Sequence, residues 1–440
     1  MQHTSSDRKI NSYISNLLFI MVFVRGNEFS EIGLLSNFDT GNPPRIVFGK
    51  NSLQTNLPQI IKDLHPKNPL IVSDDIVSKT GGLGKVEDVF KGTGTAYKTY
   101  LIPTKEPTAD MAREVSDFAR KTNPDLIVGV GGGSVMDMAK LMSIMVTNKG
   151  DPIKYCALPP DPWSDKVVNP GINKILIPTT AGTGSETSNT LVIIEKGYKT
   201  WITSSKVTAN ISLIDPVLTY TLPPVVTRNT GMDALSHLVE GVVSSLANPI
   251  SDGLIFQGVR IISKYLVRAY NNGNDEEARI NMSFAAMLGG WVIAFPWVGG
   301  PATIGHCMSE ALGPKFNIPH GQACAIMLSH AMDYNSSLIA SRLRPIAEAF
   351  GIDTYDMDDT EAAKAAIDGV LKLMKDLEMP VALKNSTKLT KSSLDEMLEY
   401  VLNERQFIYN LPAYNPRRLT KENLQILFDD IWEGKFSSTT

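Results

Sequence analysis

Three of the six histidines form one spacing pattern with an aspartate. Asp233 and His237 stand four residues apart, so on a helix they would share one face. His306 and His320 stand fourteen residues apart, on either side of a Gly313-Pro314 pair that we expect to break a helix. One carboxylate and three imidazoles suit a divalent transition metal that keeps a position open for a substrate oxygen. The alternative is four unrelated polar residues, each satisfied in a helical core.

A second pattern lies upstream, where a strand, a glycine turn and a helix follow one another. Residues 125–130 form a short apolar run typical of a buried strand, and residues 135–142 have helical periodicity. Between them stands Gly-Gly-Gly-Ser at 131–134. Glycines let a backbone approach a diphosphate, and a helix N-terminus offers it free N–H groups. The usual G-x-G-x-x-G fingerprint is not met, so a structural turn without a ligand is the alternative.

A third segment combines a strand with a polar loop. Residues 174–178 predict a strand, and eight of the nine residues at 179–187 are small or hydroxylated. Such a loop can be a plain surface turn. At the end of a strand in an alternating α/β chain it more often lines a ligand crevice.

With these motifs the chain resembles the iron-dependent, or group III, alcohol dehydrogenases. The resemblance runs from Phe48 to Asn335 and continues more faintly to the C-terminus. It rests on the segments 131–140, 178–186, 215–216, 230–237 and 305–321. It implies an α/β N-terminal dinucleotide-binding domain with a parallel sheet, followed by an all-α C-terminal domain, in the architecture shared with dehydroquinate synthase.

The resemblance also assigns site residues. Asp233, His237, His306 and His320 match the four positions that hold one divalent metal, with Fe2+ expected and Zn2+ as the alternative. The first two motifs match those that bind the pyrophosphate and nicotinamide ends of NAD(P). The expected cofactor contacts in them are Gly131, Gly132, Gly133, Ser134, Asp137, Thr179, Thr180, Thr183 and Ser185. A homodimer or higher homo-oligomer is implied as well, paired through a strand at Arg45–Phe48.

The implied reaction is hydride transfer between a primary alcohol and nicotinamide, with the metal as Lewis acid and the cofactor supplying the hydride chemistry. The reverse direction is aldehyde reduction. One rival function is a hydroxyacid–oxoacid transhydrogenase that retains its cofactor. Others are a metal-free reductase of maleylacetate-like acids, which retention of all four ligands disfavours, and a metal-stabilised binding module without NAD affinity.

Two positions depart from the family pattern. Glu310 stands where many members carry a further histidine, four residues after the third ligand. A glutamate there could relay a proton, making it a candidate catalytic residue, or bind a cationic group on the substrate. The alternative is a solvated helix residue. Glu106 stands where many members have asparagine near the cofactor, which affects the expected adenosine-side contacts.

Cofactor preference rests on Asp74, at the end of the strand predicted at 69–73. A carboxylate there can accept hydrogen bonds from the adenosine ribose hydroxyls and would repel a 2′-phosphate. We therefore predict NAD rather than NADP. The alternative is that Asp74 only caps the next helix.

Composition narrows the class of protein. A length of 440 residues suggests two domains, and a net charge of −4 without a basic cluster disfavours nucleic acid as partner. The three cysteines have no paired spacing, which fits a reducing compartment such as the cytoplasm, and we interpret Cys307 as a buried thiol. The apolar run Leu17–Val24 is too short to span a bilayer, so no membrane partner is expected.

The predicted organisation has an N-terminal extension at 1–40, an α/β domain at 41–221 and a helical domain at 222–440, with the boundary near Leu222. Strands are predicted at 45–48, 69–73, 125–130 and 174–178, and helices at 110–121, 253–270, 276–294, 338–350 and 360–377, with a break of the helix at 338–350 expected at Pro345. Aromatic residues would form the substrate pocket walls, namely Trp291, Phe295, Trp297 and Phe407, and the equal alternative is that they belong to the core.

Overall fold

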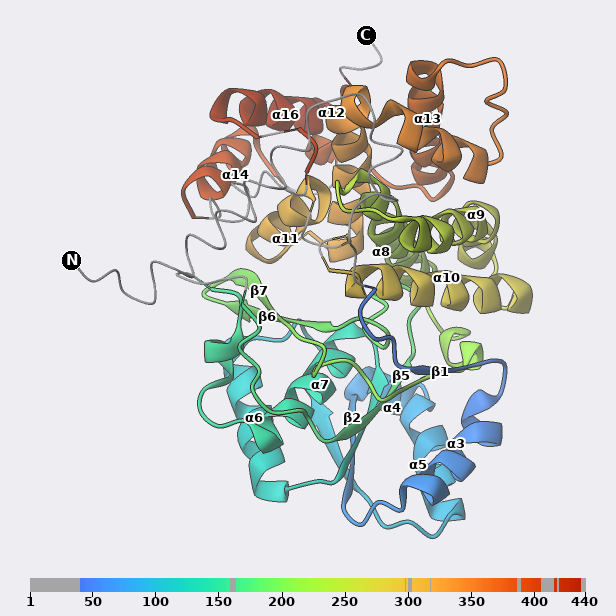
Figure 1. The fold of residues 1–440 in the computed structure, drawn as a ribbon, viewed down its shortest axis with the longest axis vertical. Coiled ribbons are helices and arrows are strands. Elements are labelled where there is room, and N and C mark those ends of the chain that lie inside the picture. Colours follow the sequence, from blue (N-terminus) through green and yellow to red (C-terminus); the bar gives the residue numbers. More distant parts are fainter. Residues whose placement is uncertain are drawn as a thin grey trace, which may run out of the picture.

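The computed structural model describes residues 40–158, 164–296, 298–299, 303–316, 318–385, 389–404, 415–417 and 419–436. A sheet flanked by helices forms one half of the molecule, and a group of packed helices forms the other (Figure 1). The apolar run at 17–24, Trp297 and Phe407 lie outside the described residues. Among those residues, no helix has the length and apolar character needed to cross a membrane.

A six-stranded, fully parallel sheet organises the first half, in the order β1-β8-β5-β4-β2-β3. Its strands are β1 (Arg45–Phe48), β2 (Pro69–Asp74), β3 (Lys98–Ile102), β4 (Leu126–Gly131), β5 (Asn173–Pro178) and β8 (Ile211–Ile214). The central strands are apolar runs because helices cover both faces of the sheet. Leu70 and Val72 of β2 join one hydrophobic cluster and Ile71 the other, as strand alternation requires.

The helices of this half pack on the two sides of the sheet. They are α3 (Ser52–Leu64), α4 (Asp75–Lys79), α5 (Gly82–Gly92), α6 (Ala109–Thr122) and α7 (Gly133–Thr147). Residues of α6 and α7 belong to one apolar cluster, and residues of α3 and α5 belong to the other. The predicted amphipathic helix at 110–121 is α6, which buries Met111 and Val115.

The Asp215-Pro216 motif has a structural role in this half. The carboxylate of Asp215 accepts hydrogen bonds from the backbone N–H of Asn51 at 3.0 Å, of Leu53 at 3.2 Å and of Val217 at 3.1 Å. It therefore satisfies N–H groups at the start of α3 that the helix itself cannot pair. This joins the end of β8 to the beginning of α3.

An antiparallel hairpin, absent from the predicted elements, extends from the sheet half towards the helical half (Figure 1). It consists of β6 (Thr190–Glu195) and β7 (Tyr198–Thr203). The hairpin packs against both α7 and α11. It thereby brings residues of the sheet half close to helices more than one hundred residues later in the chain.

The second half is helical in its described residues. Its helices are α8 (Pro224–Val243), α9 (Pro249–Asn271), α10 (Glu276–Ala294), α11 (Ile304–Phe316), α12 (His320–Ala349), α13 (Asp359–Asp376), α14 (Lys391–Glu404) and α16 (Lys421–Glu433). They share one continuous hydrophobic cluster. β8 ends at Ile214 and α8 begins at Pro224, while a boundary between independently folding units near Leu222 stays a prediction.

Two predicted helix breaks are wrong. α11 continues through Gly313 and Pro314 to Phe316, and the interruption comes only just before His320. The helix predicted at 338–350 is the last part of α12, whose irregular residue is Ile339 rather than Pro345. A proline removes a single helical hydrogen bond, and the packing of α12 along α13 holds the helix through that position.

Candidate metal centre and cofactor cleft

Of the four predicted metal ligands, the three histidines surround one oxygen atom of the fourth, Asp233. Asp233 and His237 lie one turn apart on α8, His306 lies on α11, and His320 begins α12. The Nε2 atoms of the three histidines lie 3.7, 3.6 and 3.6 Å from Oδ1 of Asp233. Among the described residues, that buried oxygen has no hydrogen-bond partner. An unsatisfied buried carboxylate oxygen is costly, and a cation surrounded by these atoms would satisfy it.

The protonation states of His237 and His320 also suit a metal, whereas at His306 burial opposes the charged form but Cys324 and Glu240 raise the pKa well above its usual value. Burial lowers the pKa of His237 to about 4 and holds the pKa of His320 well below its usual range. Both rings are therefore neutral at pH 7, the form in which imidazole binds metals. Burial opposes ionisation of Asp233, but the neighbouring His237, His320 and His306 lower the pKa of its carboxyl below the usual value. The donor set thus fits a divalent cation.

A buried carboxylate that sequence reasoning missed fixes the ring of His306. Oε1 of Glu240 lies 2.7 Å from Nδ1 of His306, and Oε2 accepts the backbone N–H of His306 at 2.9 Å. The hydroxyl of Thr303 also donates to Glu240. A Cβ on Gly305 would lie 2.7 Å from Oε1 of Glu240, so the close contact needs glycine there. Glu240 thereby turns Nε2 of His306 towards Asp233.

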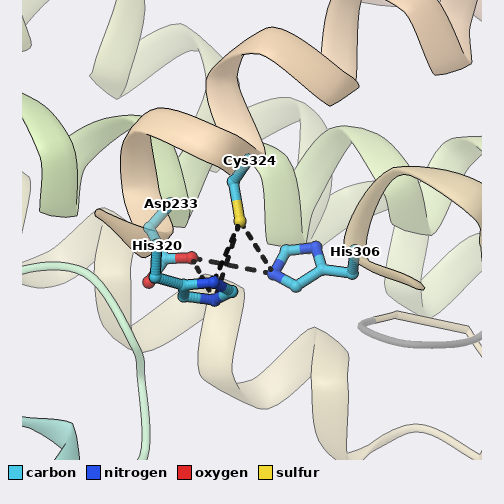
Figure 2. A group of neighbouring side chains, drawn as sticks. All are labelled: Asp233, His306, His320 and Cys324. Atoms are coloured by element: carbon cyan, nitrogen blue, oxygen red, sulfur yellow. Dashed lines mark hydrogen bonds and ion pairs between the residues drawn. The ribbon is translucent and has the colours of Figure 1, made fainter. Parts of the chain in front are cut away.

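A thiol also borders the centre. The Sγ atom of Cys324 lies 3.7 Å from Nε2 of His306 and 3.6 Å from Nε2 of His320 (Figure 2). Together with Asp233 these residues offer one ligand atom each, and all four atoms lie within 4.8 Å of one another. Sequence reasoning did not single out Cys324, although it follows His320 by four residues and so shares its helix face.

A cavity of about 340 Å³ connects this centre to the sheet half. It is lined by all four predicted ligands and by Glu310 from the helical half. From the sheet half and its hairpin the lining residues include Glu106, Gly133, Ser134, Asp137, Thr183, Ser185, Val192, Ile194, Lys199 and Trp201. The two predicted groups of site residues therefore meet in one space.

A smaller cavity of about 210 Å³ lies on the other side of the glycine turn, lined by Asp74, Lys105 and Gly132. Gly133 and Ser134, the first residues of α7, line both cavities. No side chain of the described residues caps the N-terminus of α7, which leaves its first N–H groups for an anion. A Cβ on Gly132 would lie 3.5 Å from Cγ2 of Thr180, an ordinary contact, so protein packing alone does not demand glycine there.

Four predicted cofactor residues instead hold the cleft together, as Asp137 does, or lie behind it, as Gly131, Thr179 and Thr180 do. Asp137 accepts hydrogen bonds from Oγ of Ser185 at 2.6 Å and from the backbone N–H of Val192 at 3.0 Å. Burial raises the pKa of Asp137, against the opposing effects of Lys140 and Ser185. The backbone N–H of Thr179 donates to the carbonyl of Gly131 at 3.0 Å. Gly131, Thr179 and Thr180 do not line either of these two cavities, as far as the described residues show.

Asp74 combines both roles considered for it. Its Oδ1 accepts the backbone N–H of Val77 at 2.8 Å, which caps α4. The same residue lines the smaller cavity beside Gly132. The cap uses one oxygen, and a carboxylate has capacity for further hydrogen bonds.

The two departures from the family pattern lie in the larger cavity. Glu310 is one turn after His306 on α11 and only 5% exposed, so the alternative of a solvated helix residue is wrong. Glu106 forms an ion pair with Lys199, Oε1 to Nζ at 2.9 Å. Burial opposes the charged form of Lys199, but Glu106 raises its pKa. Glu106 therefore lies on the metal side of the cleft, not beside Asp74 as an adenosine-side role would require.

The predicted aromatic walls are wrong where they can be checked. Phe295 is 1% exposed and belongs to the helical core, and Trp291 packs against that core. Neither lines the larger cavity, whereas Trp201 of the hairpin and Ile293 do. Trp291, near the end of α10, and Phe295, just after it, therefore contact the core instead of the cleft.

Comparisons with known proteins agree on one family. The profile described as iron-containing alcohol dehydrogenase matches residues 43–216, and that of the Fe-containing alcohol dehydrogenase family, C-terminal, matches residues 227–432. Long-chain-alcohol dehydrogenase 1 of Geobacillus thermodenitrificans is 31% identical over 392 residues, which cover 89% of this chain and 96% of the relative. Choline dehydrogenase of Bacillus subtilis is 35% identical over 313 residues, covering 71% and 76%. The solved alcohol dehydrogenase from Oenococcus oeni superposes with a TM-score of 0.81 at 30% identity, covering 90% of this chain and 100% of that one.

Proposed function

The chain belongs to the family of iron-containing alcohol dehydrogenases and is an NAD(P)-linked oxidoreductase, and we propose that it interconverts a primary alcohol and its aldehyde by hydride transfer with nicotinamide. One observation carries the proposal: the three imidazoles and the orphaned oxygen of Asp233 line the same cavity as the uncapped N-terminus of α7. A metal held by Asp233, His237, His306 and His320 supplies Lewis-acid polarisation of the substrate oxygen.

The residues of the sheet half bind and orient the dinucleotide. The N–H groups at Gly133 and Ser134 receive the diphosphate, because they are the free donors at the positive end of α7. Thr183 and Ser185 line the cavity towards the metal centre, where the nicotinamide must lie for hydride transfer. Asp137 keeps that loop in place through its bond to Ser185. NAD is favoured over NADP because the carboxylate of Asp74 lines the smaller cavity.

Which metal occupies the centre depends on the metal ions available to the protein as well as on the chemistry of the ligands. The family description points to Fe2+. Oxygen and imidazole donors also accept Zn2+, which has the higher intrinsic affinity. The deciding experiment measures turnover of a panel of alcohols and aldehydes with NAD and NADP, on protein reconstituted with Fe2+, with Zn2+ or without metal. Equal turnover without metal would contradict the proposal, and turnover without added NAD would favour the transhydrogenase.

Glu310 is the proposed proton-carrying residue of the cavity. Its carboxylate belongs to a buried residue one helical turn from His306, so it can pass a proton between the substrate region and solvent. A second candidate role is recognition of a cationic group on the alcohol, favoured by the Bacillus subtilis relative named choline dehydrogenase. Glu310→Gln separates the two. A relay role lowers kcat for neutral and cationic alcohols alike, whereas cation recognition raises KM for the cationic alcohol only.

The chain is further proposed to be a homodimer or higher homo-oligomer. β1 is an edge strand of the parallel sheet, so one of its sides offers backbone groups to a second copy. Sedimentation over a wide concentration range tests this. A single species at 48.1 kDa throughout would contradict it.

A further inference from the structure

We propose that Lys105 binds the diphosphate of the nicotinamide dinucleotide, together with the N-terminus of α7. The inference rests on the proposed function and deepens it, because it adds a cation to the phosphate contacts. Lys105 lies in the β3–α6 loop, residues 103–108, which joins that strand to that helix. Residues 103–105 of this loop line the smaller cavity, and residues 106–107 line the larger one.

The start of α7 borders the same two cavities as the β3–α6 loop. Gly133 and Ser134 line both cavities, while Gly132 lines the smaller one. A dinucleotide that extends from the smaller cavity to the metal centre therefore passes both segments. The proposed function places its diphosphate at the N–H groups of Gly133 and Ser134, which share the smaller cavity with Lys105.

Backbone hydrogen bonds hold the β3–α6 loop in place. Inside the loop, the N–H of Lys105 donates to the carbonyl of Pro103 at 2.8 Å. Further along, the N–H of Ile194 in the hairpin donates to the carbonyl of Pro107 at 2.7 Å, and Ile194 also forms a parallel bridge with Thr108. The backbone that carries Lys105 is thus ordered before a ligand binds, which lowers the entropic cost of binding.

The distribution of charge singles out Lys105. Among the described residues that line the two cavities, the lysines are Lys105 and Lys199, and none is an arginine. Lys199 is paired with Glu106, Nζ to Oε1 at 2.9 Å, whereas Lys105 is exposed and forms no ion pair with the described part of the chain. The N-terminus of α7 supplies about half a positive charge. A diphosphate linkage carries about two negative charges at pH 7, so a lysine beside it is needed to approach neutrality.

Asp74, in the same smaller cavity, helps to distinguish two phosphate positions. The proposed function places its carboxylate at the adenosine ribose, where the 2′-phosphate of NADP would lie. Lys105 directly precedes Glu106, which lines the cavity of the metal centre, so its place in the loop favours the diphosphate between the adenosine and nicotinamide ends. A contact to the diphosphate strengthens the binding of NAD and NADP equally, whereas a contact to the 2′-phosphate strengthens that of NADP alone.

Fluorescence titration of the full-length protein with NADH tests the proposal without relying on activity. Lys105→Met should weaken binding about fivefold at low ionic strength, the effect expected of one exposed ion pair. Lys105→Arg keeps the cation and should bind NADH nearly as the wild type does. The difference between wild type and Lys105→Met should disappear at about 1 M salt, because the Debye length is then only about 3 Å. Lys121→Met is the matched control, since Lys121 is exposed in the last turn of α6 and should not affect binding.

A second measurement identifies the group that Lys105 binds. NADPH is titrated directly, and ADP-ribose, which has the diphosphate but no nicotinamide, is titrated as a competitor of NADH. Lys105→Met should weaken all three ligands by the same factor. A loss confined to NADPH, a loss that spares ADP-ribose, or a Lys105→Arg protein as weak as Lys105→Met would overturn the diphosphate contact, as would unchanged NADH affinity in Lys105→Met. Each of these results leaves the proposed function intact, whereas a wild type that does not bind NADH would overturn both.

Discussion

Oε1 of Glu240 lies 2.7 Å from Nδ1 of His306, and the same carboxylate accepts the backbone N–H of that histidine through Oε2. Glu240 is fully buried on α8, three residues after His237. One carboxylate therefore holds both the ring and the backbone of a ligand that comes from another helix. Such outer contacts set the orientation of a metal-binding imidazole and raise its basicity.

Glu240→Gln should weaken metal affinity about tenfold or more, because outer partners of this kind contribute about 10–100-fold. The amide keeps the volume of the side chain, but only its oxygen, and not its nitrogen, can accept a hydrogen bond. Equilibrium dialysis with Zn2+ measures the effect. Ser236→Ala, on the same helix with its hydroxyl donating to the carbonyl of Met232, should leave the affinity unchanged. An unaltered dissociation constant for Glu240→Gln would remove the positioning role.

Removal of the metal should abolish turnover while NAD binding persists. The proposed ligands all belong to α8, α11 and α12, whereas the proposed phosphate contacts belong to the sheet half. His306→Ala and His320→Ala should therefore behave like chelation of the wild type. NAD affinity is followed by titration calorimetry, and His65→Ala, at the exposed end of α3, is the control. Full activity in either ligand variant would exclude this metal site.

Gly132→Val should weaken NAD binding by at least about tenfold and leave the metal content unchanged. The backbone of Gly132 is extended, with φ −77° and ψ −172°, and packing accepts a Cβ there, so the variant should fold. Its side chain would occupy the space through which the diphosphate approaches α7. Gly253→Val, at an exposed position of α9, controls for the substitution itself. Normal NAD affinity in a folded Gly132→Val protein would contradict the proposal that the diphosphate binds at the glycine turn before α7.

Glu186 should make folding stability depend on pH. Burial raises the pKa of its carboxyl to about 7 from an ordinary 4.5. The folded protein then binds more protons than the unfolded chain between these values, so the contribution is full below pH 4.5 and is lost as pH rises through 7. At about 1.4 kcal/mol per pH unit, the free energy of unfolding should fall by about 3 kcal/mol relative to Glu186→Gln.

Urea unfolding of both proteins at several pH values measures that difference. For Asp88→Asn, which removes an exposed carboxylate, the free energy of unfolding should change with pH in parallel with that of the wild type. Parallel curves for wild type and Glu186→Gln would mean that the glutamate stays ionised in the folded protein.

The sequence predicted the parts of the fold whose pattern is local. β2, β4 and β5 are continuous apolar runs because both faces of the sheet are covered. β3 was missed since it is an edge strand with mostly exposed side chains, and β8 was missed although its four residues are all buried. The hairpin β6–β7 went unrecognised although β6 is rich in β-branched residues, so its contacts could not be anticipated either.

In the site, too, the sequence predicted the residues whose pattern is local and missed the others. Asp233 and His237 have helical spacing, and the three histidines are half of the six in the chain, so a pattern search finds them. Glu240 and Cys324 follow proposed ligands by three and four residues, and helical spacing alone could have suggested them. Lys199 had no such clue, because it reaches the cavity from a hairpin whose position depends on how the two halves meet.

Replacing the carboxylate of Asp74 should shift cofactor preference. Asp74→Asn removes the negative charge but keeps an oxygen that can cap α4, so it avoids the stability loss of about 1 kcal/mol expected for a missing cap. A like charge near the 2′-phosphate costs about 1–4 kcal/mol at intermediate dielectric. Its removal should raise the NADP-to-NAD ratio of kcat/KM about tenfold or more, because about 1.4 kcal/mol corresponds to one decade. Asp75→Asn, at the first residue of α4, should leave the ratio unchanged. Because the substitution does not alter the metal centre, kcat with saturating NAD should stay the same. If the NADP-to-NAD ratio of kcat/KM does not change in Asp74→Asn, Asp74 acts only as a helix cap, and the predicted preference for NAD loses its basis.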